Sequence, residues 1–413
     1  MATVKALKAR EIRDSRGNPT IELELETLHT KAVASVPSGA SVGAHEAHEL
    51  RDNDKSTGGV TKAISHIHEA IGTAIIGKEF NQHDLDTFLC ELDGTKNKSR
   101  LGGNAILAVS VAFARAEAQE RGVALYAYLG SLDNRTTFQL PQPLFNILNG
   151  GKHAPHGIDI QECMLAPVGA KNMREQVEVA KKCVMALKAL LEQKGYGTEM
   201  GDEGGFAPGL TSNDEAFDLL VSAVEKSGHT AEQVKIALDV AASSFYKDGG
   251  YVLKAGGQEQ VVGEEDMLEW YSAAVEKYPI VSIEDGFAED DWDGFTALQK
   301  QLGEKICIVG DDLTVTNVGR IEMAVEKKAA NACIIKPNQI GTVTETIDAV
   351  RAARKAGWKI FASHRSGETL DTFISDFAVG LSCEYLKAGA PTKEERVVKY
   401  NRLMEIESEL RSV

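Results

Sequence analysis

Apolar runs that end on a polar residue recur through the second two thirds of the chain. The run at 332–342, ACIIKPNQIGT, ends on Lys336 and continues into the turn-prone pair Pro337-Asn338. Five more runs of this kind end on Asp239, Glu284, Asp311, His364 and Lys387. Consecutive ends lie 23 to 45 residues apart, close to the roughly 30 residues of one strand and helix in a (β/α)8 barrel of about 250 residues. The pattern therefore predicts an α/β barrel.

The rim of this barrel is the candidate active site. The carboxyl ends of the strands in such a barrel meet at one rim, where catalytic residues are found. We therefore expect the carboxylates of residues 239, 284 and 311 to converge with the lysines at 336 and 387. Helical patterns lie between these strands at 172–194, 213–227, 264–277, 318–329 and 344–356.

The N-terminal part shows a different pattern. TIELELET (20–27) and KAVASV (31–36) alternate as strands do, and SRGNP (15–19) is typical of the turn before them, so an antiparallel meander is expected. PSGASVGAHE (37–46) has no periodicity and reads as a loop that opens and closes over a site. Helical patterns follow at about 60–76, 83–92 and 104–121.

A polar stretch, SLDNRTT (131–137), separates these patterns from the strand and helix units. We place the domain boundary there, which gives an α+β capping domain at 1–135 and a catalytic barrel at 136–413. A chain of 413 residues is long enough for two such domains.

Composition narrows the class of protein. Its 43% hydrophobic and 26% charged residues are ordinary for a globular enzyme, and no apolar run approaches the roughly 20 residues that span a bilayer. The N-terminus lacks the apolar core of a secretory signal, so a cytoplasmic location is expected. The net charge of −16 opposes direct binding of nucleic acid or an anionic membrane. Six cysteines without a C-x-x-C pair favour buried reduced thiols.

Three acids at successive strand ends predict a metal site. Carboxylate oxygens of the kind offered by Asp239, Glu284 and Asp311 are the ligands that Mg²⁺ prefers. Each acid alone fits equally well as the N-cap of the helix after its strand. In the pair Asp311-Asp312, one carboxylate would bind metal while the other caps the helix or orients a ligand. Three such acids together favour the metal.

Lys336 is a candidate general base. A lysine near bound cations and partly removed from water has its ammonium form disfavoured, so it could accept a proton near neutral pH. SHRSGET (363–369) offers His364, Arg365 and Ser366 next to a glycine, a combination that suits a phosphate or carboxylate. The alternative for this segment is the turn at the start of a helix, with an incidental arginine.

Two earlier glycine-rich loops carry further candidates. LNGGKHAPHGIDIQE (148–162) contains His153 and Glu162, and EMGDEGGFAP (199–208) contains Glu203. Glu203 would serve as a proton donor if neighbouring carboxylates raised its pKa. A tight turn with a solvated acid is the alternative.

Together these segments closely resemble the enolase family. The family's motifs DSRGNPT, PSGAS, LNGG, GDEGGFAP, SIED, GDDLTVTN, KPNQIGT, SHRSGET and KAGAP all occur in order between residues 14 and 391. The resemblance implies a small α+β N-terminal domain followed by a barrel of ββαα(βα)6 type. It also implies a lyase that reversibly dehydrates 2-phospho-D-glycerate to phosphoenolpyruvate, in glycolysis and gluconeogenesis.

The resemblance also implies a role for each matching residue. Asp239, Glu284 and Asp311 would bind one Mg²⁺, and Ser41 would help to hold a second that arrives with substrate. Lys336 would remove the proton next to the substrate carboxylate, and Glu203, with Glu162 beside it, would protonate the departing hydroxyl. The other positions implied to contact substrate are Arg365 and Ser366 at the phosphate, and Lys387, Gln161, His153 and His364.

Three positions depart from the family pattern. Val42 replaces the usual threonine of the first loop, Cys163 stands where phenylalanine is common, and Glu405 replaces an arginine that pairs with a partner subunit's acid, matched here by Glu22. A homodimer or higher homo-oligomer is still expected from the resemblance.

An acid-sugar dehydratase of the same superfamily is the rival function. An additional scaffold or surface-binding role, with a minor cell-surface or secreted fraction, is the other alternative.

Overall fold

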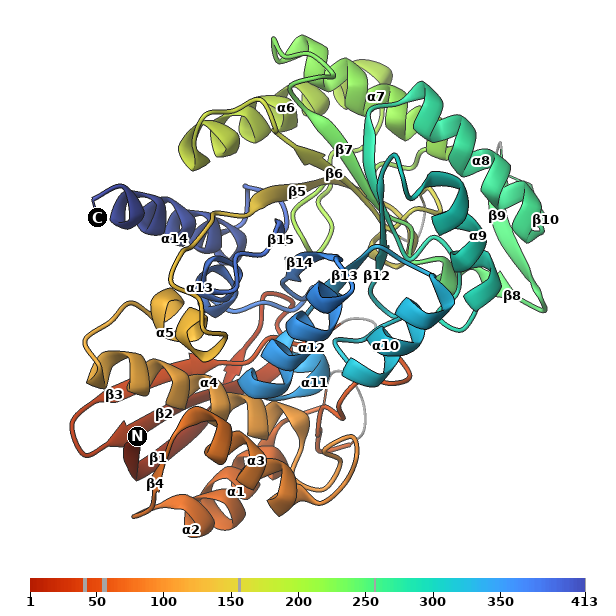
Figure 1. The fold of residues 1–413 in the computed structure, drawn as a ribbon. Coiled ribbons are helices and arrows are strands. Elements are labelled where there is room, and N and C mark those ends of the chain that lie inside the picture. Colours follow the sequence, from red (N-terminus) through yellow and green to blue (C-terminus); the bar gives the residue numbers. More distant parts are fainter. Residues whose placement is uncertain (40–42, 54–57, 155–156, 256–257, 413) are drawn as a thin grey trace.

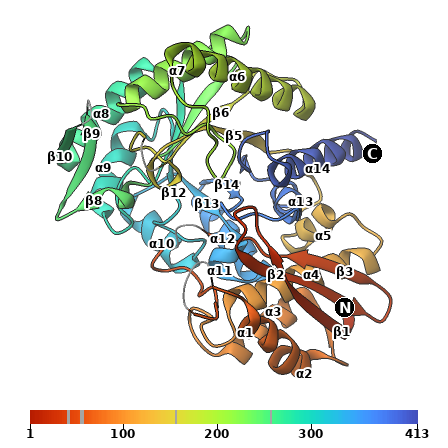
Figure 2. The same cartoon turned by 180° about the vertical axis from the view of Figure 1, so that it is seen from behind.

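The computed structural model describes residues 1–413 except 40–42, 54–57, 155–156, 256–257 and 413, which Figure 1 draws as a thin grey trace. An antiparallel sheet with helices forms the N-terminal part, below a barrel ringed by helices in the view of Figure 1. The same arrangement is seen from behind in Figure 2.

The N-terminal sheet has the strand order β3-β2-β1-β4. β1 (Ala2–Arg13), β2 (Pro19–Thr27) and β3 (Lys31–Ser35) pair antiparallel, which confirms the predicted meander, and β4 (Glu79–Phe80) joins β1. In β2 the apolar residues Ile21, Leu23 and Leu25 are buried while the glutamates between them are not. This alternation lets one face of the sheet pack on helices.

Helices cover that face of the sheet. They are α1 (Thr61–His66), a π-helical turn (Ile67–Ile71), α2 (Gly72–Ile75), α3 (Gln82–Asp93), α4 (Gly103–Glu120) and α5 (Leu125–Leu132). The alanine-rich α4 is buried almost throughout and packs on β2 and β3. The sequence predicted these helices within two residues, except α5, which was not predicted.

Eight strands close into a barrel in the order β11-β12-β13-β14-β15-β5-β6-β7. β6 runs antiparallel to both of its neighbours, β5 and β7, and the other neighbouring pairs are parallel. The strands are β5 (Gln142–Asn149), β6 (Glu162–Ala166), β7 (Lys235–Asp239), β11 (Ile280–Glu284), β12 (Cys307–Gly310), β13 (Ala332–Ile335), β14 (Lys359–Ser363) and β15 (Tyr385–Lys387).

The reversed strand confirms the expected ββαα(βα)6 order and has a consequence for the rim. Because β6 runs against the others, its first residue lies at the carboxyl ends of its neighbours. Glu162 accordingly pairs with Asp239 in the register of β6 and β7. A residue that begins a strand therefore joins residues that end theirs.

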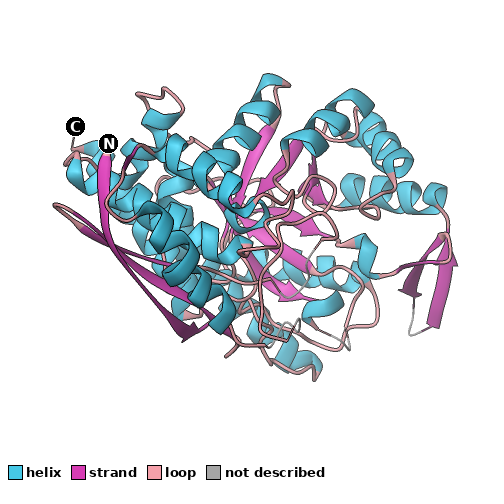
Figure 3. Ribbon diagram, turned by 90° about the horizontal axis from the view of Figure 1, so that it is seen from below, coloured by secondary structure: helices cyan, strands magenta, loops and turns pink. Residues whose placement is uncertain are grey.

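Helices surround the barrel, as Figure 3 shows from below. They are α6 (Met173–Lys194), α7 (Asn213–Lys226), α8 (Glu264–Lys277), α9 (Trp292–Leu302), α10 (Val318–Lys327), α11 (Pro337–Ile340), α12 (Val343–Lys355), α13 (Phe373–Gly380) and α14 (Glu394–Arg411). The five predicted barrel helices are confirmed within two residues at each end. Among the rest, α14 matters most below because its buried face reaches the site.

One connection leaves the regular pattern. Between β7 and α8 the chain forms a three-stranded sheet of β8 (Tyr246–Lys247), β9 (Gly250–Ala255) and β10 (Gln258–Val262) at the edge of the molecule (Figure 1). This insertion accounts for the longest spacing between strand ends, the one from Asp239 to Glu284.

Small and branched side chains fill the barrel interior, a separate cluster that includes Ala237, Val309, Ile334 and Phe361. The cysteines are free, and only Cys90 is not fully buried. Among the described helices, none combines the length and apolarity needed to cross a bilayer. We propose the domain boundary at 135–136, in the segment that joins α5 to β5.

Candidate active site

A polar cavity of about 490 Å³, including its opening, lies at the carboxyl rim of the barrel. Its lining includes every predicted site residue that the structure describes except Glu284, which contacts the lining residue Lys387. These predicted residues are His153, Gln161, Glu162, Glu203, Asp239, Asp311, Lys336, His364, Arg365, Ser366 and Lys387. Ser41 lies outside the described residues.

Strand geometry explains how the charged residues reach this cavity. Side chains two residues apart on a strand point to the same face. Ala237, Val309 and Ile334 pack inside the barrel, so residues two positions later face the same interior at its rim. Those residues are Asp239, Asp311 and Lys336, and Lys387 follows Tyr385 in the same way.

Lys387 joins three acids at this rim. Its Nζ lies 2.7 Å from Oδ2 of Asp239, 2.9 Å from Oε1 of Glu284 and 3.2 Å from Oε2 of Glu162. All four side chains are buried. Burial alone would lower the pKa of Lys387, but Asp239 and the other acids raise it well above its usual value. Lys387 is therefore a fixed positive charge in the floor of the cavity.

Lys336 pairs with Asp311 on the neighbouring strand end. Gln339 of α11 holds the other carboxylate oxygen of Asp311, with 2.9 Å between Nε2 and Oδ1. Burial would lower the pKa of Lys336, but the Asp311 carboxylate outweighs it and the pKa is raised. The lowered pKa expected from sequence was conditional on bound cations near Lys336 and stays a prediction. Among the protein's own groups, the anionic partner Asp311 dominates.

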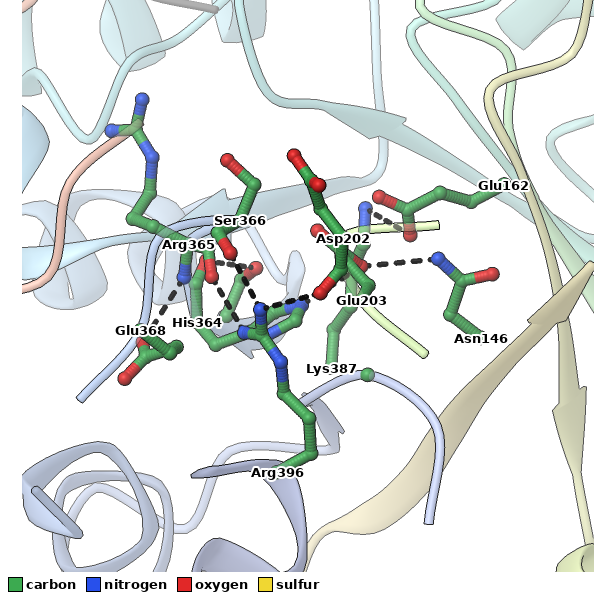
Figure 4. A network of polar contacts seen from close by, with 12 residues as sticks. Asn146, Glu162, Asp202, Glu203, His364, Arg365, Ser366, Glu368, Lys387 and Arg396 are labelled. Carbon is green, nitrogen blue, oxygen red and sulfur yellow. Dashed lines mark hydrogen bonds and ion pairs between the residues drawn. The ribbon is translucent and has the colours of Figure 1, made fainter. Parts of the chain in front are cut away.

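Glu203 lies across the cavity on the loop between α6 and α7. Its Oε2 is 3.0 Å from Nδ2 of Asn146 and 3.1 Å from Nε2 of His364, as Figure 4 shows. Burial would raise the pKa of Glu203, but His364, His153 and Arg396 hold it well below its usual range. The expected upward shift is instead found at the neighbouring Glu162, where burial and the charge of Glu203 raise the pKa.

His153 approaches Glu162 from the opening of the cavity. Its Nδ1 lies 3.7 Å from Oε1 of Glu162 and has no hydrogen-bond partner among the described residues. Gln161 lies beside them, with 3.5 Å between its Nε2 and Oδ2 of Asp239. This wall thus offers polar atoms that a ligand could still engage.

The 363–369 loop supplies a buried guanidinium. Arg365 makes a two-point ion pair with Glu46, at 2.7 and 3.2 Å, and its Nη1 also lies 3.2 Å from Oδ1 of Asn338. Ser366 lines the same cavity. Because guanidinium groups bind carboxylate and phosphate with the same fork geometry, a phosphoryl group would meet Arg365 where Glu46 now lies.

The donor set of the cavity fits a divalent cation. Its lining contains seven carboxylates and three cationic side chains; the carboxylates are Glu46, Glu162, Glu203, Asp239, Asp285, Asp311 and Asp312, and the cations are Lys336, Arg365 and Lys387. Burying such an excess of negative charge is costly without a compensating cation. Hard carboxylate oxygens suit a divalent metal ion.

The grouping of these carboxylates differs in detail from the expected triad. Among the described residues, two sets of three bring their ligand atoms within 4.8 Å of one another: His153, Glu162 and Glu203, and Asp285, Asp311 and Asp312. The predicted ligands Asp239 and Glu284 instead share the ammonium of Lys387.

Several contributors to the site were missed from sequence. Asp285 accepts hydrogen bonds from the backbone N–H groups of Asp311 and Asp312, both at 2.8 Å, and so orients the end of β12. A signal existed for Asp285, because it directly follows Glu284 at a strand end. Glu46 ends the 37–46 loop that was expected to close over a site, but its pairing with Arg365 was not predicted, and nothing local marked the helical residue Arg396.

Comparisons with known proteins cover nearly the whole chain. A family model described as "Enolase, N-terminal domain" matches residues 4–129, and one described as "Enolase, C-terminal TIM barrel domain" matches residues 137–413. A protein named Enolase 1 from Methylococcus capsulatus is 52% identical over 415 residues, which cover 99% of this chain and 98% of the relative.

Proposed function

The chain belongs to the enolase family, and from this premise we propose that it is a phosphopyruvate hydratase, a lyase of glycolysis and gluconeogenesis. It would interconvert 2-phospho-D-glycerate and phosphoenolpyruvate by loss and addition of water. One observation carries the proposal: the same cavity is lined by Lys336, Glu203 and Arg365, together with more carboxylates than cationic side chains.

Substrate would be held at both of its anionic ends. Arg365 and Ser366 would bind the phosphate, with Arg365 exchanging its Glu46 partner for phosphate oxygens. Lys387, fixed among three acids, would face the substrate carboxylate. His153 and Gln161 would line the pocket between the two ends.

Asp239, Glu284 and Asp311 are the residues that would hold Mg²⁺, and Ser41 would assist a second Mg²⁺. When bound, these cations would stabilise the extra negative charge that develops on the substrate carboxylate. The acids are preformed at adjacent strand ends, in register between β7 and β11. The ammonium groups of Lys336 and Lys387 form ion pairs with these carboxylates. We therefore expect a metal cation that binds the carboxylates to displace the lysines from them.

The reaction would proceed in two proton transfers. Lys336, in its neutral form, would take the proton from the carbon next to the substrate carboxylate, and the electron pair would pass into that carboxylate. Glu203, protonated, would then give its proton to the hydroxyl that leaves as water, and the double bond forms as the electron pair returns. Glu162, whose pKa is raised by burial and by Glu203, would be the nearest carboxyl for sharing that proton.

The experiment is a direct assay with 2-phospho-D-glycerate and Mg²⁺, which follows the ultraviolet absorbance of phosphoenolpyruvate. Turnover that a chelator abolishes and added Mg²⁺ restores would support the proposal. Unphosphorylated acid sugars serve as the comparison substrates. If the protein dehydrated only the unphosphorylated acid sugars, Arg365 would not bind a phosphate as proposed. The protein would then be an acid-sugar dehydratase.

We also propose a homodimer or higher homo-oligomer in the cytoplasm. Within one chain, Glu22 already pairs with Arg10 at 2.5 Å, and Glu405 pairs with Arg402 at 3.1 Å. The family's contact between these two positions would therefore be replaced by others here. Light scattering of the purified protein would give the number of subunits.

A further inference from the structure

Arg396 is a fully buried arginine on α14 that none of the proposed catalytic roles uses. Its Nη1 lies 2.6 Å from Nδ1 of His364 and 2.7 Å from the carbonyl oxygen of Arg365, and its Nη2 lies 2.5 Å from that of Ser366 (Figure 4). Nη2 also reaches the carbonyl of Asp202, the residue before Glu203, at 3.3 Å. One guanidinium thus contacts the segments on both sides of the Glu203–His364 pair.

The chemistry of arginine settles which nitrogen of His364 carries the proton. A guanidinium only donates hydrogen bonds and is not deprotonated in proteins. Nδ1 of His364 must therefore accept from Arg396, so it carries no proton. The single proton of the neutral imidazole is then on Nε2, where it faces Oε2 of Glu203 at 3.1 Å.

The surroundings of His364 favour this neutral form. The charged groups that act on it are Glu203, Arg396 and Glu368, and burial is the largest influence on its pKa, which is lowered to about 4. Glu203 would otherwise favour the imidazolium, but a donor already aimed at Nδ1 leaves no site for a second proton. Asn146 gives Glu203 its other hydrogen bond.

Close packing around Arg396 holds this arrangement in place. The 389–396 segment also contacts the Glu203 loop through its backbone and side chains: the N–H of Ala390 lies 2.9 Å from the carbonyl of Glu203, and Nζ of Lys393 lies 2.9 Å from that of Gly201. A Cβ added at Gly389 would come within 2.9 Å of the Arg396 side chain. The guanidinium therefore has little freedom to move.

We propose that Arg396 is a positioning residue that holds His364 as the neutral Nε2–H tautomer and so fixes the hydrogen bond and orientation of Glu203. This inference rests on the proposed function, because it assigns Arg396 to the second proton transfer and leaves Lys336 to the first. Arg396 would act on the departure of the hydroxyl and leave removal of the α-proton intact.

The test compares Arg396→Lys with Arg402→Lys. Arg402 lies on the same helix and pairs with Asp376 at 2.8 Å, and none of its hydrogen bonds or ion pairs reaches the site residues. Dehydration of 2-phospho-D-glycerate and exchange of its α-proton in D2O are measured for both variants. In Arg396→Lys, at saturating substrate, we expect kcat for dehydration to fall about 10- to 100-fold and the rate of exchange to change less than about threefold, because only the second step is affected. Arg402→Lys should match the wild type in both.

A second readout is independent of turnover. Histidine ring nitrogens labelled with ¹⁵N, assigned with His364→Gln, report the tautomer by NMR. In the wild type we expect His364 to carry its proton on Nε2. In Arg396→Lys we expect a mixture of the two tautomers and an imidazole that protonates at higher pH. The acid side of the pH profile of kcat should then shift to higher pH. Equal loss of exchange and dehydration, an Nδ1–H tautomer in the wild type, or wild-type kcat in Arg396→Lys would each overturn the proposal. A wild-type enzyme inactive in both reactions would instead refute the proposed function.

Discussion

The two walls of the cavity are built on different physical principles. On the wall formed by β6, β7, β11, β12, β13 and β15, charge is balanced by charge: Lys387 among three acids, and Lys336 against Asp311. On the wall around Glu203, its carboxylate accepts hydrogen bonds from an amide and a neutral imidazole, and Arg396 holds that imidazole while it donates to backbone carbonyls. We call these the ion-paired wall and the hydrogen-bonded wall.

The difference explains the direction of two pKa shifts. A lowered pKa was expected for Lys336 only near bound cations, and a raised pKa for Glu203 only if neighbouring carboxylates dominated. Among the protein's own groups, the pKa of Lys336 is raised and that of Glu203 is lowered. In each case a neighbour outweighs burial: the Asp311 carboxylate beside Lys336, and hydrogen-bond donors and cationic groups around Glu203. The protein side chains therefore hold Lys336 protonated and Glu203 ionised. For their proposed roles as base and acid, we expect substrate and cations to displace these neighbours.

The largest effect should come from the base on the ion-paired wall. Lys336→Ala removes the group that we propose takes the α-proton, so both exchange of that proton and dehydration should fall by about 10³- to 10⁴-fold. Lys336→Arg is the matched variant, because it keeps a cation against Asp311 but is not deprotonated. It should fail as completely as alanine, as measured by phosphoenolpyruvate absorbance and loss of the substrate's α-proton in D2O. Substantial exchange in either variant would show that another group removes the proton.

The next effect should separate the walls. Glu203→Gln keeps the shape of the side chain and its contacts with Asn146 and His364 but removes the transferable proton. Dehydration should fall about 10²- to 10³-fold while α-proton exchange persists, because Lys336 is untouched. Asp202→Asn removes a neighbouring charge and should leave both reactions near wild type. Parallel loss of exchange in Glu203→Gln would mean that the two walls do not act in separate steps.

The contrast between the walls also marks what the sequence could predict. The ion-paired wall was readable because strand ends in a barrel meet at one rim, so Asp239, Asp311, Lys336 and Lys387 could be grouped from their spacing alone. Glu162 escaped that logic, because it begins a reversed strand. It was picked out with His153 from its glycine-rich loop, and the family resemblance put it beside Glu203. The ββαα(βα)6 order likewise came from the resemblance.

For the hydrogen-bonded wall, the sequence predicted the functional residues but not the side chains that surround them. Glu203 and His364 stand out in glycine-containing loops, whereas Arg396 lies in a helix, EERVVKYNRLMEIESELR, that mixes charged and apolar residues and does not mark this arginine as buried. Its burial follows from packing against two distant loops, which no local pattern encodes. Glu46 is similar, since its partner Arg365 lies 319 residues away.

A smaller effect should appear in stability at acid pH. The pKa of His364 is lowered to about 4 by burial, whereas an unfolded histidine titrates near 6.5. Between these values the unfolded chain binds more protons, so acidification favours unfolding. From pH 7 to pH 5 the wild type should lose about 2 kcal/mol more stability than His364→Gln, measured by urea unfolding. An identical loss in the variant would show that His364 titrates normally in the folded protein.

The smallest effect concerns the link between the N-terminal part and the phosphate position. Glu46 holds Arg365 with two hydrogen bonds, and a phosphoryl substrate must displace that carboxylate to gain the same fork. Glu46→Gln weakens the competitor while Gln can still accept the N–H of Gly43, which Glu46 holds at 3.0 Å. The KM for 2-phospho-D-glycerate should therefore fall about three- to tenfold, close to 1 kcal/mol. Glu49→Gln is the comparison variant: Glu49 pairs with Arg51 and acts on Arg365 through its charge, so its removal should lower KM less than Glu46→Gln does. If KM instead rose in Glu46→Gln, Glu46 would be a support that aims Arg365 at the phosphate, and the N-terminal part would assist binding where we expect it to compete.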